Sequence, residues 1–118
     1  MLKAIEKGLP WTAFERLRKN LALPADRVAE MIAIPRRTLA RRKIEKRFTR
    51  EESDRLLRVA RVFSRALQLY DGDREAAVTW LTRRVPALGA RPITLLQTEI
   101  GAQEVERVIG ALEHGIFL

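Results

Sequence analysis

Two prolines, Pro24 and Pro35, fix where two short helices of this chain can begin. Proline is tolerated at the start of a helix, because its missing N–H would have had no partner there, but it breaks a helix interior. Between the two prolines, Val28 and Ile32 belong to one apolar helical face, and residues 33–35 form a short joint. The sequence therefore predicts two short helices connected by a tight turn.

The residues around this joint indicate how the two helices would pack. Ala29 is small enough to lie where two crossing helices approach, and Ile34 and Leu39 would hold the second helix against the first. This spacing is typical of a helix-turn-helix. The joint has Ala33 where such motifs favour glycine, and Pro35 where a Ser or Thr cap is more usual. We therefore expect an atypical turn.

The second of these helices lies in a strongly basic stretch. Residues 34–48 hold seven basic side chains and a single acidic one. If Leu39 faces the core, a rotation of about 100° per residue turns Ala40 and Arg41 away from it. The candidate DNA-binding residues are Arg36, Arg37, Ala40, Arg41, Lys43, Lys46 and Arg47. The alternative is a solvated face of an ordinary three-helix bundle, which is the commoner reason for a run of charges.

Charge is distributed unevenly along the chain. The formal net charge is +8 and the isoelectric point is about 11. Residues 1–58 contain sixteen Lys or Arg against eight Asp or Glu, whereas residues 59–118 contain seven of each. All of the excess positive charge therefore precedes residue 59, and a polyanion such as nucleic acid is the kind of partner that this surface would attract.

Apolar periodicity and capping residues predict helices along the rest of the chain. A capping box at Thr49 and Glu52 begins a long helix to about Tyr70, whose apolar stripe is wide enough for burial on two sides. Such a helix could connect two halves or lie at a subunit contact. Other helix boundaries are expected at Pro10, Asp73, Pro86, Pro92, Thr98 and Gly115. The prediction is an all-α fold, with a helix-turn-helix bundle over residues 1–50 and a small helical domain over residues 51–118.

The end of the chain suits a contact with another protein. Gly110 lies inside the last predicted helix, where glycine costs about 1 kcal/mol relative to alanine, so we interpret it as a place where another backbone approaches closely. An apolar tail follows the helix and could fold back on the chain or cover a partner. The candidate contact residues are Arg91, His114, Gly115, Ile116, Phe117 and Leu118.

The residues needed for catalysis are missing. The chain has no cysteine, which excludes disulfides and thiolate zinc sites, and its single histidine, His114, is better explained by a favourable interaction with the end of a helix. We expect no enzyme activity, metal site or cofactor. No apolar run has the length of a membrane span or secretion signal. We therefore expect a cytoplasmic protein with no membrane contact.

The second half carries a motif that resembles a known family. From Trp80 to Phe117 the order is WL, PALG, RP, LL, TE, GA, a valine and then EHGIF. This pattern resembles the toxin-binding domain of Xre/ParS-type antitoxins, and the basic first half resembles the Xre helix-turn-helix that commonly precedes it. Together the two resemblances cover nearly the whole chain.

The resemblance implies a function made of two binding activities. It implies an antitoxin that binds a cognate toxin with a RES domain, an enzyme that degrades NAD, and covers its active site. It also implies that the helix-turn-helix binds operator DNA and represses the antitoxin's own operon. Because such motifs usually read two half-sites, we expect a homodimer. The alternatives are a helix-turn-helix transcription regulator without a toxin partner, and a basic protein that binds RNA or the ribosome.

Overall fold

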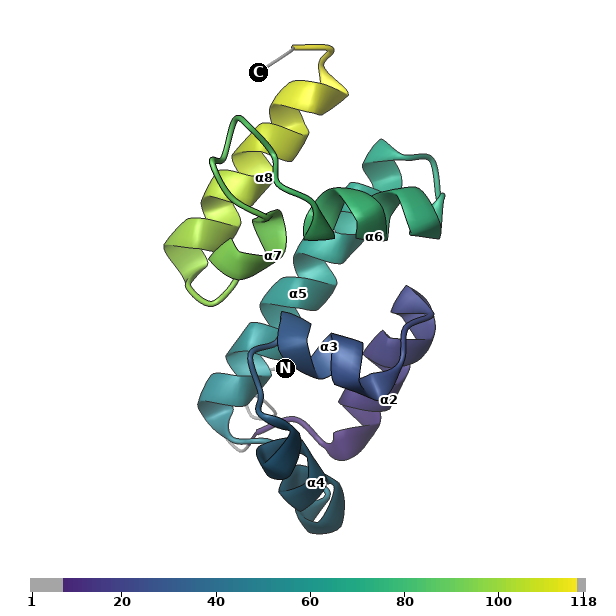
Figure 1. Ribbon diagram of the computed structural model, residues 1–118, viewed down its shortest axis with the longest axis vertical. Helices are drawn as coiled ribbons and strands as arrows, with labels where there is room; N and C mark the ends of the chain where they lie inside the picture. The colour runs from purple at the N-terminus through teal and green to yellow at the C-terminus, as the bar shows by residue number, and fades with distance from the viewer. Residues whose placement is uncertain (1–7, 117–118) are drawn as a thin grey trace. The chain divides into compact units, whose positions relative to one another are not determined.

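The computed structural model describes residues 8–116, which form helices and no strand (Figure 1). The chain divides into two compact units, with the boundary between Leu57 and Arg58. The all-α prediction is confirmed for these residues. Their helices are α2 (Trp11–Leu21), α3 (Ala25–Met31), α4 (Arg36–Glu45), α5 (Arg50–Leu69), α6 (Arg74–Thr82), α7 (Pro92–Leu95) and α8 (Glu99–Glu113).

The first unit is built on an aromatic cluster beneath α2. The Trp11 ring lies 4.9 Å from the Phe14 ring and 5.6 Å from the Phe48 ring, measured between centroids. Phe14 and Phe48 are buried, and burying rings of this size is a large part of the free energy that holds a small domain together. Because Phe48 follows α4 in the chain, this cluster fixes the end of α4 against α2.

Backbone pairing closes the first unit around this cluster. The Trp11 N–H donates to the Lys46 carbonyl at 2.9 Å, and the Phe48 N–H donates to the Leu9 carbonyl at 2.9 Å. The Leu9 N–H donates to the buried Ser53 hydroxyl at 2.8 Å. The segment before α2 is therefore held by the residues after α4 and by the first turn of α5.

The long helix α5 contributes to both units. It begins with the predicted capping box, in which the Thr49 N–H donates to Glu52 at 2.8 Å and the Glu52 N–H donates to the Thr49 hydroxyl at 3.2 Å. The unit boundary falls within α5, so its first turns belong to the first unit and its remainder to the second. Part of the wide apolar stripe is buried within one unit or the other. Its buried apolar residues are Leu56, Val59, Val62, Phe63 and Ala66.

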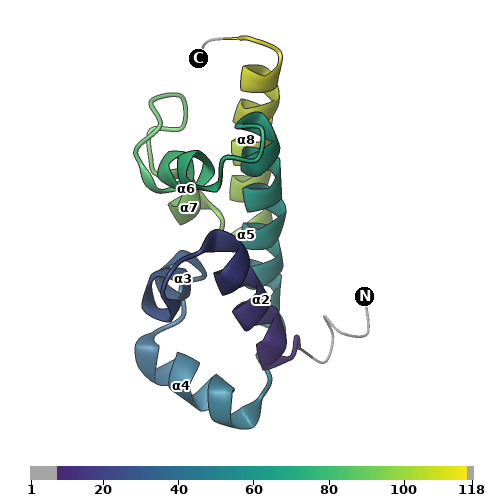
Figure 2. The ribbon, with the colours of Figure 1, turned by 90° about the vertical axis from the view of Figure 1, so that its right-hand side faces the viewer.

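The second unit packs α6 against α7, and α7 against α8. Figure 2 shows α8 running along α5, and ion pairs join the two helices. Arg61 contacts Glu99 at 2.8 Å, and Arg65 contacts Glu113 at 3.0 Å. The core residues contributed by α6 and α8 are Ala77, Trp80, Leu81, Ala102, Val105, Val108 and Ile109. None of the helices in residues 8–116 is long and apolar enough to cross a membrane.

Two predicted helix starts of the second unit are confirmed by their hydrogen bonds, whereas α6 ends at Thr82, before the predicted boundary at Pro86. The Asp73 carboxylate accepts from the Ala76 N–H at 3.1 Å, and the Thr98 hydroxyl accepts from the Gly101 N–H at 3.0 Å. Gly115 ends the last helix with a positive φ of 74°. Each of these residues satisfies backbone groups that a helix end leaves without partners.

The interpretation of Gly110 is wrong. A Cβ atom at Gly110 would meet the Arg65 side chain at 3.7 Å, which is an ordinary contact, and no backbone from another element of residues 8–116 lies within 4 Å. The close approach occurs at Gly101 instead, where a Cβ atom would collide with the Leu95 carbonyl oxygen. The rule that a helical glycine marks a close approach therefore holds in α8. It holds for the glycine near the start of the helix and not for Gly110.

The two glycines of α8 should respond oppositely to alanine. Gly110→Ala should raise the free energy of unfolding by about 1 kcal/mol, because alanine has the higher helix propensity and the site has room. Gly101→Ala should lower it by about 1–3 kcal/mol through the clash with Leu95. Urea unfolding followed by circular dichroism measures both. A loss at Gly110 equal to that at Gly101 would mean that the space around Gly110 is occupied in the folded protein.

Candidate nucleic-acid and protein interfaces

The turn between α3 and α4 forms with alanine at the position that favours glycine. Ala33 has a positive φ of 56°, a conformation that costs an L-residue about 1–2 kcal/mol. The Ile34 N–H donates to the Ala29 carbonyl at 2.9 Å across this turn. Arg55 from α5 donates its Nε to the Ile32 carbonyl at 2.9 Å. These hydrogen bonds hold the turn in place, and Pro35 then precedes the first residue of α4.

Helix α4 presents its basic side to solvent, as its periodicity predicts. Leu39 is buried, and Arg42 on the same side is half-buried. Ala40 and Arg41 are exposed. All of the predicted DNA-binding residues are exposed in the structure: Arg36, Arg37, Ala40, Arg41, Lys43, Lys46 and Arg47. They lie on α4 and on the residues that follow it.

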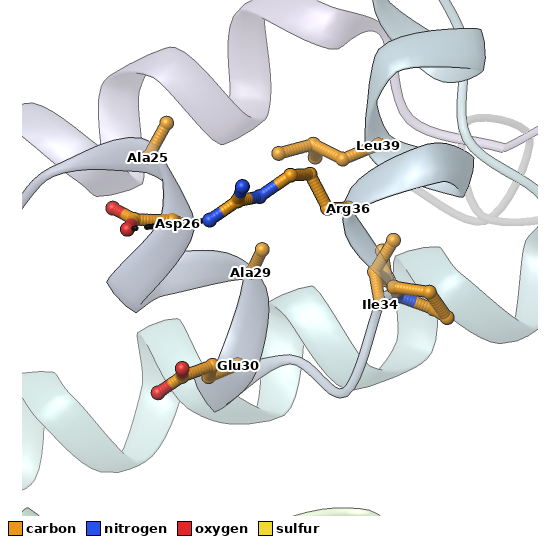
Figure 3. Close-up of a pocket in the computed structure, with 8 residues that line it drawn as sticks. Ala25, Asp26, Ala29, Glu30, Ile34, Arg36 and Leu39 are labelled. Carbon is orange, nitrogen blue, oxygen red and sulfur yellow. Dashed lines mark ion pairs between the residues drawn. The ribbon is translucent and has the colours of Figure 1, made fainter.

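Two of these basic side chains have partners within the first unit. Arg36 reaches across a pocket between α3 and α4 toward Asp26, with 4.0 Å between its Nη2 and the carboxylate (Figure 3). That pocket has a volume of about 560 Å³. Arg47 donates to the Gly8 carbonyl at 2.9 Å. The side chains of Arg37 and Arg41 make no hydrogen bond or ion pair with any residue in 8–116.

The predicted contact residues of the second unit lie on two elements. Arg91 precedes α7, its carbonyl accepts from the Thr94 N–H at 3.0 Å, and its side chain is exposed. His114 ends α8, where its Nδ1 lies 2.7 Å from the Gly110 carbonyl oxygen. Ile116 is 53 % exposed. Phe117 and Leu118 lie outside the described residues.

Potential metal ligands do not cluster in the described residues. Within 8–116 no group of three or more His, Asp or Glu residues is placed to hold a metal ion. A second pocket, of about 370 Å³, lies beside α6. Its lining mixes acidic, basic, aromatic and small side chains: Tyr70, Asp73, Glu75, Ala76, Thr79, Trp80 and Arg83.

Comparison with known proteins matches each unit to a described domain. The family model for the antitoxin Xre-like helix-turn-helix domain matches residues 1–61, and that for the antitoxin Xre/MbcA/ParS C-terminal toxin-binding domain matches residues 65–115. The chain belongs to the Xre antitoxin family. The antitoxin Xre of Yersinia enterocolitica is 38% identical over 119 aligned positions, covering 99% of this chain and 80% of that protein. The antitoxin Xre of Photorhabdus laumondii subsp. laumondii is 34% identical, over 95% of this chain and 77% of that protein.

The two family matches contain different sets of the predicted binding residues. The exposed basic face of α4 lies within the Xre-like helix-turn-helix match, and Arg91 and His114 lie within the toxin-binding match. The boundary between the two matches falls inside α5. Both domains of this Xre antitoxin therefore use one continuous helix.

Sequence reasoning missed two residues of α4. Arg42 was not singled out, although it is the basic residue of α4 that faces inward. Ile44 was also not singled out, although it is 81 % exposed in the middle of the basic residues. A signal for Ile44 was present, because five residues beyond Leu39 a helix has turned about 140° away from the core.

Arg42 fastens α4 to α5 instead of joining the basic face. Its Nε lies 2.7 Å from Glu52 Oε1 and its Nη2 lies 3.1 Å from Glu52 Oε2, while Nη1 contacts Glu45 at 2.8 Å. The hydrogen bonds to Glu52 and Glu45 raise the pKa of Arg42 above its usual range. Burial raises the pKa of Glu52, but the hydrogen bonds from Arg42 and Thr49 outweigh it, so that this pKa lies below its usual value.

Removing the charge of Glu52 should therefore destabilise the fold in a pH-dependent way. Glu52→Gln should lower the free energy of unfolding at pH 7 by about 1–3 kcal/mol, because it weakens charged hydrogen bonds at a buried site. A carboxylate with a lowered pKa stabilises the fold above its unfolded value of about 4.3 and loses that effect as pH falls. The difference between wild type and variant should shrink below about pH 4.

The neighbouring Glu51 provides the matched control. Glu51 lies in the same first turn of α5 but is exposed, so Glu51→Gln should change the free energy of unfolding by less than about 0.5 kcal/mol. Urea unfolding at several pH values measures both variants. An equal loss for Glu52→Gln at every pH would show that shape, and not the charge of Glu52, holds the two helices together.

Proposed function

We propose that this antitoxin neutralises a RES-domain toxin that degrades NAD and represses its own operon through α4. The observation that carries the proposal is the division of charge between the two domains. All excess positive charge precedes residue 59, and the exposed face of α4 holds much of it. The toxin-binding domain follows with balanced charge. The antitoxin would act in the cytoplasm by binding, without a cofactor and without catalysing a reaction.

The exposed residues of α4 would contact different parts of the operator DNA. Arg36, Arg37 and Arg41 start the outward face, so we assign them to base edges in the major groove. The remaining basic residues of the face, Lys43, Lys46 and Arg47, are assigned to phosphates. Ala40 is small and would let the helix lie close to the duplex. Specificity would then come from three arginines and affinity from the whole face.

Reading an operator in this way favours a homodimer. Helix-turn-helix proteins usually bind two half-sites about one helical turn apart, roughly 34 Å. Leu57, Leu67 and Tyr70 of α5 are only half-buried, which leaves apolar surface for a second copy. We propose that two chains bind each operator.

Binding to the DNA upstream of the antitoxin gene should depend steeply on salt. If about six phosphates are neutralised, log K should fall with log salt at a slope near −5. Arg37→Ala should cost about 1–3 kcal/mol and relax the preference for the operator, whereas Lys46→Ala should weaken binding to all sequences alike. Fluorescence anisotropy measures the affinities, and light scattering should find two chains per operator.

Two results would contradict this assignment of α4. One is an affinity that does not change with salt. The other is the same loss on operator and random DNA for both variants, which would mean that the reading face is misassigned. Arg84→Ala is the charge-matched control, because Arg84 is an exposed arginine of the other domain and should not affect DNA binding.

The second domain would supply the toxin contact through its loop and its C-terminal end. The motif between Trp80 and Phe117 supports a RES-domain toxin as the partner. Ile116 is half exposed just after α8, and Phe117 and Leu118 continue the apolar tail in the sequence. Arg91, exposed before α7, would be a polar anchor near the toxin's active site. His114 and Gly115 connect the helix to the tail and would lie at the edge of the contact.

Neutralisation and repression should be separable by mutation. The double variant Arg36→Ala and Arg37→Ala should lose repression yet still protect cells from the toxin, because both changes lie outside the toxin-binding domain. Deleting residues 116–118 should impair protection but leave DNA binding intact. Burying each apolar side chain contributes about 1.5–3 kcal/mol, which is one to two decades of affinity.

Co-expression of the toxin with each variant tests this separation. Growth and cellular NAD report protection, and a reporter behind the operon's promoter reports repression. If the tail deletion protects as fully as the intact chain, the inhibitory contact does not include the tail and must lie in the Trp80 to Gly101 segment.

A further inference from the structure

The exposed face of α4 includes apolar side chains next to its arginines. Ile44 is 81 % exposed, and its position five residues after Leu39 turns it about 140° from the core side of the helix. Ala40, also exposed, lies one turn before it and Arg37 lies one turn before Ala40. On a helix, residues three and four apart lie on one face. Ile44 and Ala40 therefore form a short apolar line on the exposed face, next to Arg37 and Arg41.

The surroundings of Ile44 are mostly cationic, and the acidic neighbour Glu45 is paired with Arg42 at 2.8 Å. Arg41 is exposed one turn before it, and Lys43 and Lys46 lie beside it and after the helix. Single exposed apolar residues are ordinary on protein surfaces, and exposure alone indicates nothing. Ile100 is such a case, because it is 77 % exposed but lies in a helical turn with Glu99, Gln103 and Glu104. What distinguishes Ile44 is an apolar side chain between exposed basic residues, with the neighbouring acid Glu45 already paired with Arg42.

The complement of this face is a surface with one apolar group between rows of negative charge. The major groove of DNA has this chemistry, since phosphates line its edges and the C5-methyl group of thymine is the apolar group on its floor. A second copy of α4 would bring the same positive charge and would be repelled. We propose that Ile44 contacts a thymine methyl group in each operator half-site and contributes to sequence preference. This inference rests on the proposed binding of operator DNA by α4.

Deoxyuridine provides a direct test, because it removes the thymine methyl group and keeps the hydrogen-bonding pattern of the base. The probes are the duplex upstream of the antitoxin gene, made with thymine or with deoxyuridine throughout, and a random duplex made in both forms. Wild-type antitoxin should bind the thymine operator about three- to tenfold more tightly than the deoxyuridine operator. The random duplexes, which correct for altered DNA flexibility, should differ less.

Substitution of Ile44 should remove that preference. Ile44→Ala should weaken binding to the thymine operator by a similar factor and should bind the deoxyuridine operator almost as wild type does. Replacing Ile44 and removing the thymine methyl group together should therefore weaken binding about as much as either change alone. Such non-additivity is the signature of a direct contact. Because Ile44 is exposed, the variant should unfold at the wild-type temperature. Ile100→Ala is the matched control and should keep the full preference for thymine.

Each other outcome overturns the proposal in a distinguishable way. If Ile44→Ala keeps the wild-type preference for thymine, operator binding stands but Ile44 does not read the methyl group. If Ile44→Ala binds DNA normally and weakens the dimer or the toxin complex instead, the residue belongs to a protein contact. If wild-type antitoxin does not distinguish operator from random DNA at all, both this inference and the proposed DNA recognition fail.

Discussion

The placement of α4 depends on one carboxylate, that of Glu52. This side chain accepts from the Thr49 N–H as the second half of a capping box and receives two hydrogen bonds from Arg42. A side chain that begins one helix thus also binds the helix before it. A carboxylate buried in this way is tolerated only when its charge is met, since an unpaired buried charge is costly. The Arg42 guanidinium, itself with 15 % of its side chain exposed, meets it.

The same interaction decides which arginines remain available to a partner. Arg42 is hydrogen-bonded within the fold. The exposed side chains of Arg37 and Arg41 make no hydrogen bond or ion pair with any residue in 8–116. Neither side chain forms an ion pair with a carboxylate in 8–116, which leaves a positive potential over this helix face. Arg36 is intermediate, because it lies 4.0 Å from Asp26 and both side chains are largely exposed. Such a contact is weak in water, and it would exchange readily for a phosphate or a base.

Much of this arrangement was predictable because it depends on residues three or four apart. The capping box, the core position of Leu39 and the outward turn of Arg41 follow from helical geometry alone. The pairing of Arg42 with Glu52 joins residues of two different helices, so no local pattern reveals it. The prediction of a close backbone approach at Gly110 was wrong for the same reason. Glycine in a helix has a local cost that sequence shows, but the space around it is a property of the packed unit.

Helix α5 supplies hydrogen-bond donors to backbone carbonyls at a helix end in each domain. The last carbonyls of a helix lack partners within that helix, and a cation is favoured there. Arg55 donates to the Ile32 carbonyl at the end of α3, and Arg58 donates to the Leu96 and Gln97 carbonyls after α7. The two arginines are three residues apart on α5, one in each unit. Each holds the turn that precedes a helix with a proposed binding role, α4 in one unit and α8 in the other. An uninterrupted α5 is therefore part of how each domain positions its own proposed binding element.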